Sequence, residues 1–209
     1  MTQIRYAGLD GEMTGSGSRE SGPAAEKYQL IQIGLATMQI GERPEAIVFV
    51  PKTLRTYTSD IGYQQWNSQV QAMEVNKFTS ERIRAGPIPS AVDADAAKWL
   101  DERVGPGKRD LHAVGWNVGS FDMPFVARYL PNLFDRFSYR SVDLNSIIFS
   151  MADTDDEYKA LKHKAKTRAE SALRVIGIEP NYHDAGYDAA SALMAFKYLR
   201  EEILFEEFV

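Results

Sequence analysis

The chain has 209 residues, 44% of them hydrophobic and 25% charged, which is ordinary for a globular protein and enough for one well-packed domain or two small ones. The net charge of −5 argues against a protein that coats nucleic acid by charge alone, and the absence of cysteine excludes disulfides and Cys-ligated zinc. No apolar run is long enough to span a membrane and the N-terminal residues lack the apolar core of a signal peptide, so we expect a cytoplasmic protein without a membrane partner.

The first part of the chain predicts three strands and one loop. Residues 4–10 have the pattern of a buried strand, residues 28–40 alternate like a long strand, and residues 45–50 like a third. A turn signal at 41–44 predicts that the last two strands form a hairpin. The Gly- and Ser-rich segment 14–27 predicts a loop, which we expect to be mobile without substrate and to border the site.

The rest of the chain alternates strands and helices. Residues 111–116 and 139–144 predict a fourth and a fifth strand, and the charged stretch 153–166 predicts a mobile loop. This order indicates one α/β domain over residues 1–209, with a central mixed sheet of five strands flanked by helices. Helices are expected near 65–75, 79–84, 91–104, 120–130, 167–178 and 186–205, and directly after 139–144.

Acidic residues follow two of the predicted strands and open the last helix. Asp10 and Glu12 lie one residue apart, so on a strand their side chains share one face. Two buried carboxylates repel each other, and a strand that carries them usually holds cations. Asp122 follows the fourth strand in GWNVGSFDMPF, and His183 precedes Asp188 in HDAGYDA.

These three motifs, in this order, resemble those of the DEDD superfamily of 3′–5′ exonucleases, which share the ribonuclease H-like fold. DGEMTG is similar to the first motif of oligoribonuclease, and HDAGYDA fits the H-x-A-x-x-D-A pattern of the DEDDh branch, to which proofreading subunits of replicative polymerases and ribonuclease T also belong. The middle motif departs from the proofreading subunits, because three residues instead of two separate Asn117 from Phe121. It is more similar to the exonuclease domains of B-family polymerases, yet Asp184 stands where that tyrosine branch has its tyrosine.

The resemblance, which extends from residue 4 to about residue 200, implies hydrolysis of single-stranded 3′ ends with release of nucleoside monophosphates and two bound Mg²⁺ or Mn²⁺ ions. Asp10 would bridge both ions, Glu12 and Asp188 would hold the ion that activates water, and Asp122 would support the ion at the leaving oxygen. His183 would be the general base. Each residue alone also has a structural explanation, such as a turn or a helix cap, and the combination favours function.

Five further residues are candidates for substrate contact, although packing or turn formation would explain them as well. Met13 could wedge against the last base, and Asn117 could orient the second motif. The basic stretch 159–168 could hold upstream phosphates, but a solvated helix or loop face is favoured. Asp143 and Asp184 are expected to be structural or peripheral. The five candidates are Met13, Thr14, Asn76, Phe78 and Asn117.

Other functions remain open at this point. A non-catalytic, polymerase-associated interaction subunit could keep the fold, but it would have no reason to keep all five motif residues. An internal nuclease of the ribonuclease H type shares the metal chemistry and is disfavoured by the third motif. DNA and RNA are balanced as substrates, since the first motif favours short RNA and the second DNA. A homodimer or a polymerase partner is not determinable from the sequence.

Overall fold

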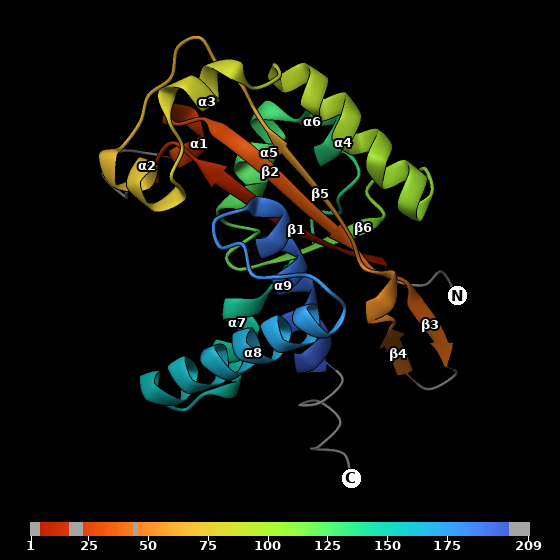
Figure 1. Ribbon diagram of the computed structural model, residues 1–209. Coiled ribbons are helices and arrows are strands. Elements are labelled where there is room, and N and C mark those ends of the chain that lie inside the picture. The colour runs from red at the N-terminus through yellow and green to blue at the C-terminus, as the bar shows by residue number, and fades with distance from the viewer. Residues whose placement is uncertain (1–4, 17–22, 44–45, 201–209) are drawn as a thin grey trace.

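Five strands form the central sheet of the computed structural model, which describes residues 5–16, 23–43 and 46–200. The strand order is β5-β2-β1-β6-β7, with β2 antiparallel to β1 and β5, and with β6 parallel to β1 and β7. The predicted α/β class and mixed five-stranded sheet are therefore confirmed (Figure 1). The strands are β1 (Arg5–Met13), β2 (Leu30–Thr37), β5 (Arg55–Asp60), β6 (Leu111–Gly115) and β7 (Val142–Asp143).

Helices cover both faces of this sheet, and each face has its own apolar core. Along β1, Ala7 and Leu9 point into one core and Tyr6 into the other, as the alternation of a strand requires. One core is closed by α4 (Pro89–Val104), α5 (Asp122–Tyr129) and α6 (Pro131–Phe134), and the other by α7 (Leu144–Met151), α8 (Asp155–Val175) and α9 (Ala185–Tyr198) (Figure 1). The remaining helices are α1 (Ala24–Lys27), α2 (Val70–Asn76), α3 (Ser80–Ala85) and the short 3-10 turn Pro51–Thr53.

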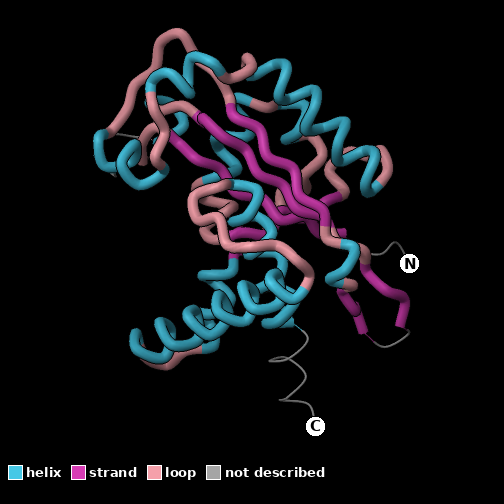
Figure 2. Tube along the Cα trace, viewed as in Figure 1, coloured by secondary structure: helices cyan, strands magenta, loops and turns pink. Residues whose placement is uncertain are grey.

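The predicted pairing of the second strand was wrong. The strand β2 pairs with β5, and residues 45–50 contribute instead to a separate two-stranded sheet of β3 (Ile40–Arg43) and β4 (Ala46–Phe49). Figure 2 shows this small sheet projecting beyond the end of the main one. The strand β5 escaped prediction because it is an edge strand with the polar sequence RTYTSD, half of it exposed, which carries no apolar alternation.

The charged stretch 153–166 is helical from Asp155 on, contrary to the predicted loop, and α8 continues without a break to Val175, through most of the helix expected at 167–178. Thr154 and Glu157 form a reciprocal capping box at its start. The buried face of the helix is one narrow stripe formed by Ala165, Ala169 and Leu173. Alanine at this spacing gives a weak apolar signal, which the surrounding charges mask.

Two other predictions fall partly outside the described ranges. Within the loop expected at 14–27, residues 24–27 are helical, and residues 17–22 lie outside the described part of the chain. The expected end of the last helix near 205 lies outside it as well. In the described ranges, no helix combines the length and the apolar character needed to cross a membrane.

Candidate active site

Asp10 and Glu12 lie in the last residues of β1, where the strand runs past the paired part of β6. Gly8 faces α9, because a Cβ added there would lie 2.2 Å from the carbonyl oxygen of Ala189. Side chains two and four residues further on point the same way, so both carboxylates face α9. An irregularity in the pairing with β2 follows directly between Glu12 and Met13, a feature that often re-aims side chains next to functional sites.

The helix α9 brings Asp188 to these carboxylates through unusually close packing on the sheet. A Cβ at Gly34 would lie 1.9 Å from the carbonyl carbon of Ala185, and a Cβ at Gly186 would lie 1.9 Å from Thr58 Oγ1. The neighbour of Gly34 is backbone, which cannot yield, so only glycine fits there, and the first turn of α9 lies against β2 and β5. Asp188 belongs to that first turn and therefore lies next to β1.

A chain of polar side chains, which sequence reasoning missed, fixes the start of α9. The backbone N–H of Ala185 donates to Gln32 Oε1 at 2.8 Å, and the Gln32 amide donates to Asp60 Oδ1 at 2.8 Å. Arg82 then donates two bonds to the same carboxylate, each 2.7 Å long. Asp184 caps α9 by accepting from the backbone N–H of Tyr187 at 3.0 Å. Apart from the Asp184 cap, these contacts join residues far apart in the sequence, and no local sequence pattern predicts them.

Asp122 is the first residue of α5 and approaches the same region from the other layer. Its side chain is buried, and Oδ1 accepts the backbone N–H of Gly11 at 3.1 Å, between the two acidic residues of β1. Asp143, by contrast, caps α7 by accepting from the backbone N–H groups of Asn145 and Ser146. Asp143 therefore has a structural role of its own, and only its charge reaches Asp122, whose pKa it raises slightly.

His183 lies in the loop before α9 with its side chain exposed and with a left-handed φ of 63°. This conformation is uncommon outside glycine, and the backbone N–H of His183 donates to Asp188 Oδ2 at 3.2 Å. One ligand atom from each of Glu12, His183 and Asp188 lies within 4.8 Å of the others, so these three side chains could hold a metal ion.

Burial and neighbouring negative charges raise the pKa of all four carboxyl groups. Burial, and then the charges of Asp188 and Asp122, raise the pKa of Glu12 to about 8. Burial raises the pKa of Asp122 to about 7 and also raises that of Asp188. The pKa of Asp10 lies well above its usual value, first through burial and then through the charges of Asp122, Asp188 and Glu12. Four acidic groups that are costly to ionise together are a fitting oxygen donor set for a hard divalent cation.

A hollow of about 290 Å³ opens beside this cluster, and two of the candidate substrate residues border it. Its wall includes Glu12, Met13 and Asn76, together with Phe121 at the start of α5. Met13 is 5% exposed and packs in the core, while its carbonyl oxygen accepts from Asn76 Nδ2 at 2.9 Å. Asn76 itself is buried. The described end of the first loop, Gly15 and Ser16, also borders the hollow.

The other three candidates lie elsewhere. Thr14 is buried and its Oγ1 accepts the backbone N–H of Gln29 at 2.9 Å, and Phe78 is buried beneath Arg82, whose guanidinium carbon lies 3.7 Å from the ring centroid. Both belong to the described ranges, and neither lines the hollow. Asn117 is exposed with a φ of 61°, and its Oδ1 accepts from Asn145 Nδ2 at 2.9 Å.

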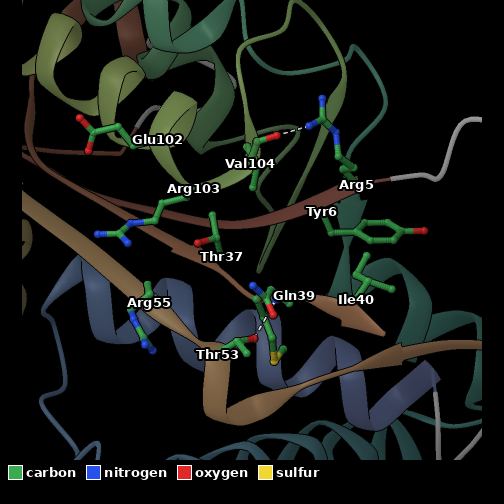
Figure 3. A pocket seen from close by; sticks show the side chains of 11 residues that line it. Arg5, Tyr6, Thr37, Gln39, Ile40, Thr53, Arg55, Glu102, Arg103 and Val104 are labelled. Atoms are coloured by element: carbon green, nitrogen blue, oxygen red, sulfur yellow. Dashed lines mark hydrogen bonds between the residues drawn. The ribbon is translucent and has the colours of Figure 1, made fainter. Parts of the chain in front are cut away.

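A different hollow, of about 420 Å³, lies at the opposite end of β1 (Figure 3). Arg5, Arg55 and Arg103 line it, but Arg5 points away from the other two and donates to the carbonyl oxygen of Val104. Its guanidinium also pairs with Asp110, and Arg55 donates to the carbonyl oxygen of Leu54. The three cations therefore do not converge on one ligand position. The acidic cluster at the carboxyl end of β1 remains the site whose groups converge.

Fold and site together define an α/β domain whose central sheet carries an acidic cluster at the carboxyl end of its first strand. Solved exonuclease structures share this fold. Escherichia coli Exonuclease I in complex with a dT13 oligonucleotide matches with a TM-score of 0.58 and 17% identity, over 98% of this chain and 43% of that one. Cell-death related nuclease 4 (CRN-4) matches with a TM-score of 0.54 and 12% identity, over 94% of this chain and 64% of that one.

These matches confirm the expected ribonuclease H-like fold, which this chain shares with Exonuclease I and CRN-4. The chain spans less than half the length of Exonuclease I, which has also been solved with a zinc ion and single-stranded DNA. No model of a known protein family matches the sequence, and a search of curated proteins finds no significant match either.

Proposed function

We propose that the chain is a metal-dependent 3′–5′ exonuclease of the DEDDh type, with residues 1–209 as its single domain, that releases nucleoside monophosphates from single-stranded 3′ ends. The observation that carries this proposal is the convergence of the motif residues. Asp10, Glu12, Asp122 and Asp188 come from three separate elements, β1, α5 and α9, and the charges of Asp122 and Asp188 are close enough to raise the pKa of both Asp10 and Glu12. The shared fold with exonucleases that have been solved with DNA supports it further.

Two Mg²⁺ or Mn²⁺ ions would be held by Asp10, Glu12, Asp122 and Asp188. When bound, such a pair of ions supplies a hydroxide near neutral pH and offsets charge on the attacking and leaving oxygens. The donor set fits, because carboxylate oxygens are the ligands that these ions prefer and because no cysteine competes for softer metals.

The protein's own groups supply position and proton transfer. The Gly11 backbone N–H orients Asp122, and the His183 backbone N–H orients Asp188. The exposed His183 imidazole, beside Glu12 and Asp188, is placed to take a proton from an attacking water.

The terminal nucleotide would occupy the hollow beside Glu12, with Met13 and Asn76 in its wall. Thr14 and Phe78 would support that wall from behind, since both are buried. Asn117, exposed at the end of β6, would contact the strand further upstream.

Digestion of 5′-labelled single strands tests the proposal. DNA and RNA oligonucleotides are incubated with the protein in Mg²⁺ or Mn²⁺, with Asp10→Asn as the inactive variant. A ladder that shortens from the 3′ end is expected for the wild type only, and comparison of the two sugars identifies the preferred substrate. Internal cuts would indicate a ribonuclease H-type endonuclease. Intact oligonucleotides under all conditions would indicate a non-catalytic interaction subunit of the same fold.

A further inference from the structure

Two lysines on α8 rest on the same tryptophan. The ammonium groups of Lys162 and Lys166 lie 5.3 Å and 5.1 Å from the centroid of the Trp116 ring. Trp116 directly follows β6, the strand beside β1, and is half-buried. Within the described ranges, neither ammonium forms a salt bridge with a carboxylate. Two cations of an acidic protein are thus held against an aromatic face at the carboxyl edge of the sheet.

Hydrogen-bonded polar side chains connect Lys162 with α7 and with the loop that follows β6. Lys162 Nζ lies 3.4 Å from the Tyr158 hydroxyl, which donates to Asn145 Oδ1 at 2.8 Å. The Asn145 amide in turn donates to Asn117 Oδ1 at 2.9 Å. We name this set the α8 strip, and Figure 1 shows α7 and α8 together on the α9 side of the sheet. Its members are Trp116, Asn117, Asn145, Tyr158, Lys162 and Lys166.

One end of the α8 strip lies at the acidic cluster. Trp116, against which both ammonium groups lie, directly follows Gly115, and a Cβ added at Gly115 would lie 2.7 Å from the carbonyl oxygen of Leu9. Leu9 precedes Asp10, so the tryptophan holds the two lysines beside the carboxyl end of β1. Lys162 lies four residues from Lys166 towards the start of α8, about 6 Å along the axis. This separation is comparable with the distance between neighbouring phosphates of a single strand.

We propose that the α8 strip binds the sugar-phosphate backbone of a single-stranded nucleic acid, with Lys166 and Lys162 on successive phosphates upstream of the bond that is cut. This inference rests on the proposed function and deepens it, because it names the path that the strand takes away from the acidic cluster. Both cations sit on a long, capped helix and against a tryptophan ring, which limits the freedom that they lose on binding.

The charges at the start of α8 limit the length of this path. Its first turn carries Asp155, Asp156 and Glu157, just beyond Tyr158 at the far end of the α8 strip. A phosphate that reached this turn would meet repulsion. We therefore expect a short footprint of about four nucleotides, at the small end of known single-strand sites.

Binding at different salt concentrations tests the inference. Fluorescence anisotropy of a 5′-labelled oligothymidylate of about 12 nucleotides is measured in Ca²⁺, under conditions in which the wild type leaves the oligonucleotide uncut. Each lost phosphate contact on a single strand lowers the slope of log K against log salt by about 0.7, so Lys162→Gln and Lys166→Gln should each do so and the double variant by about 1.4. Lys98→Gln, with the same charge change on α4 across the sheet, should leave the slope unchanged.

The length series gives the second readout. Wild-type affinity should rise with oligonucleotide length up to about four nucleotides and then level off, and the double variant should lose most of this rise. Unchanged slopes in both lysine variants, with a wild type that still trims 3′ ends, would overturn the α8 strip and leave the proposed function intact. A wild type that neither binds nor trims single strands would overturn both.

Discussion

The folded structure raises the pKa of the Glu12 carboxyl group into the physiological pH range. Its pKa in the folded protein is about 8, raised from 4.5 by burial and by Asp188 and Asp122. A raised folded pKa means that the protonated group favours the folded state. Its contribution to stability is complete below the unfolded pKa and is lost as pH rises through the folded pKa. Asp122, with a folded pKa of about 7, acts in the same direction.

We therefore predict that the metal-free protein loses thermal stability as pH rises from about 5 to 8. Glu12→Gln, which stays neutral, should show a clearly smaller loss across this range. Melting curves in a chelator at several pH values measure the effect, and the difference between wild type and variant isolates Glu12 from the other ionisable groups. Parallel curves for the two proteins would show that Glu12 is already solvated in the folded state.

A second prediction concerns His183. If its imidazole takes the proton from water, His183→Ala should slow hydrolysis on the order of 10²–10⁴-fold. Its affinity for Mn²⁺, measured by calorimetry, should change little, because the four carboxylates would hold the ions. His163→Ala, an exposed histidine of α8, serves as the control.

The position of His183 makes one alternative outcome informative. Its ring lies close enough to Glu12 and Asp188 to share an ion with them. Loss of metal affinity together with activity would make His183 a ligand. Normal turnover in the variant would remove it from the proposed mechanism.

At the scale of elements, the contact between α9 and the sheet decides whether the site forms. Gly34→Ala would place a methyl group 1.9 Å from the backbone of Ala185, which cannot yield like a side chain. We predict a loss of about 1–3 kcal/mol in the free energy of unfolding, or more, together with lower activity as Asp188 moves away from β1. Chemical denaturation and activity at temperatures where the variant is folded measure the two effects separately.

Gly41→Ala is the matched control for this prediction. A Cβ at Gly41 would meet its nearest neighbour at 3.5 Å, an ordinary contact, so stability and activity should stay close to wild type. Equal losses in both variants would mean that alanine is tolerated poorly in these strands for reasons other than the approach of α9. A Gly34→Ala variant with full stability would show that α9 can shift without cost.

The sequence predicts those elements whose stabilisation is local or strongly apolar. The strands β1, β2 and β6 are buried, and their patterns show it. The edge strand β5 depends on pairing with β2, and α8 depends on a narrow alanine stripe packed against α9, so neither has a strong pattern of its own.

The same distinction holds for the candidate site. Its acidic residues stand in short motifs with fixed spacing, and the structure brings those of β1, α5 and α9 together. The bonds from Arg82 through Asp60 and Gln32 to Ala185, in contrast, link four separate segments. Only the folded chain brings such residues together, and the same is true of Lys166 and the acidic cluster.

At the scale of the whole molecule, metal binding at the acidic cluster would be coupled to folding. In the metal-free protein, burial and neighbouring negative charges oppose the ionisation of Asp10, Glu12, Asp122 and Asp188, which lowers the stability of the folded state at neutral pH. An unfolded chain holds these residues far apart and binds an ion only weakly. Any divalent ion that binds the folded cluster therefore raises the free energy of unfolding by mass action, by about 2.7 kcal/mol at a hundredfold excess over the dissociation constant, and raises the melting temperature with it.

Asp10→Asn should raise the stability of the metal-free protein and reduce the further stabilisation that metal ions provide. Without metal, the variant should melt at a higher temperature than wild type, because a buried charge and its repulsion from Asp122 and Asp188 are gone. With Mg²⁺ or Mn²⁺, it should gain little further stability, since the carboxylate that would bridge the ions is missing, and it should not cut nucleic acid. Asp95→Asn, which removes an exposed charge on α4, should keep the wild-type response to metal. Melting curves with and without each ion measure both effects at once. A variant that is less stable without metal and still gains the full wild-type shift would show that Asp10 supports the strand and takes no part in holding the ions.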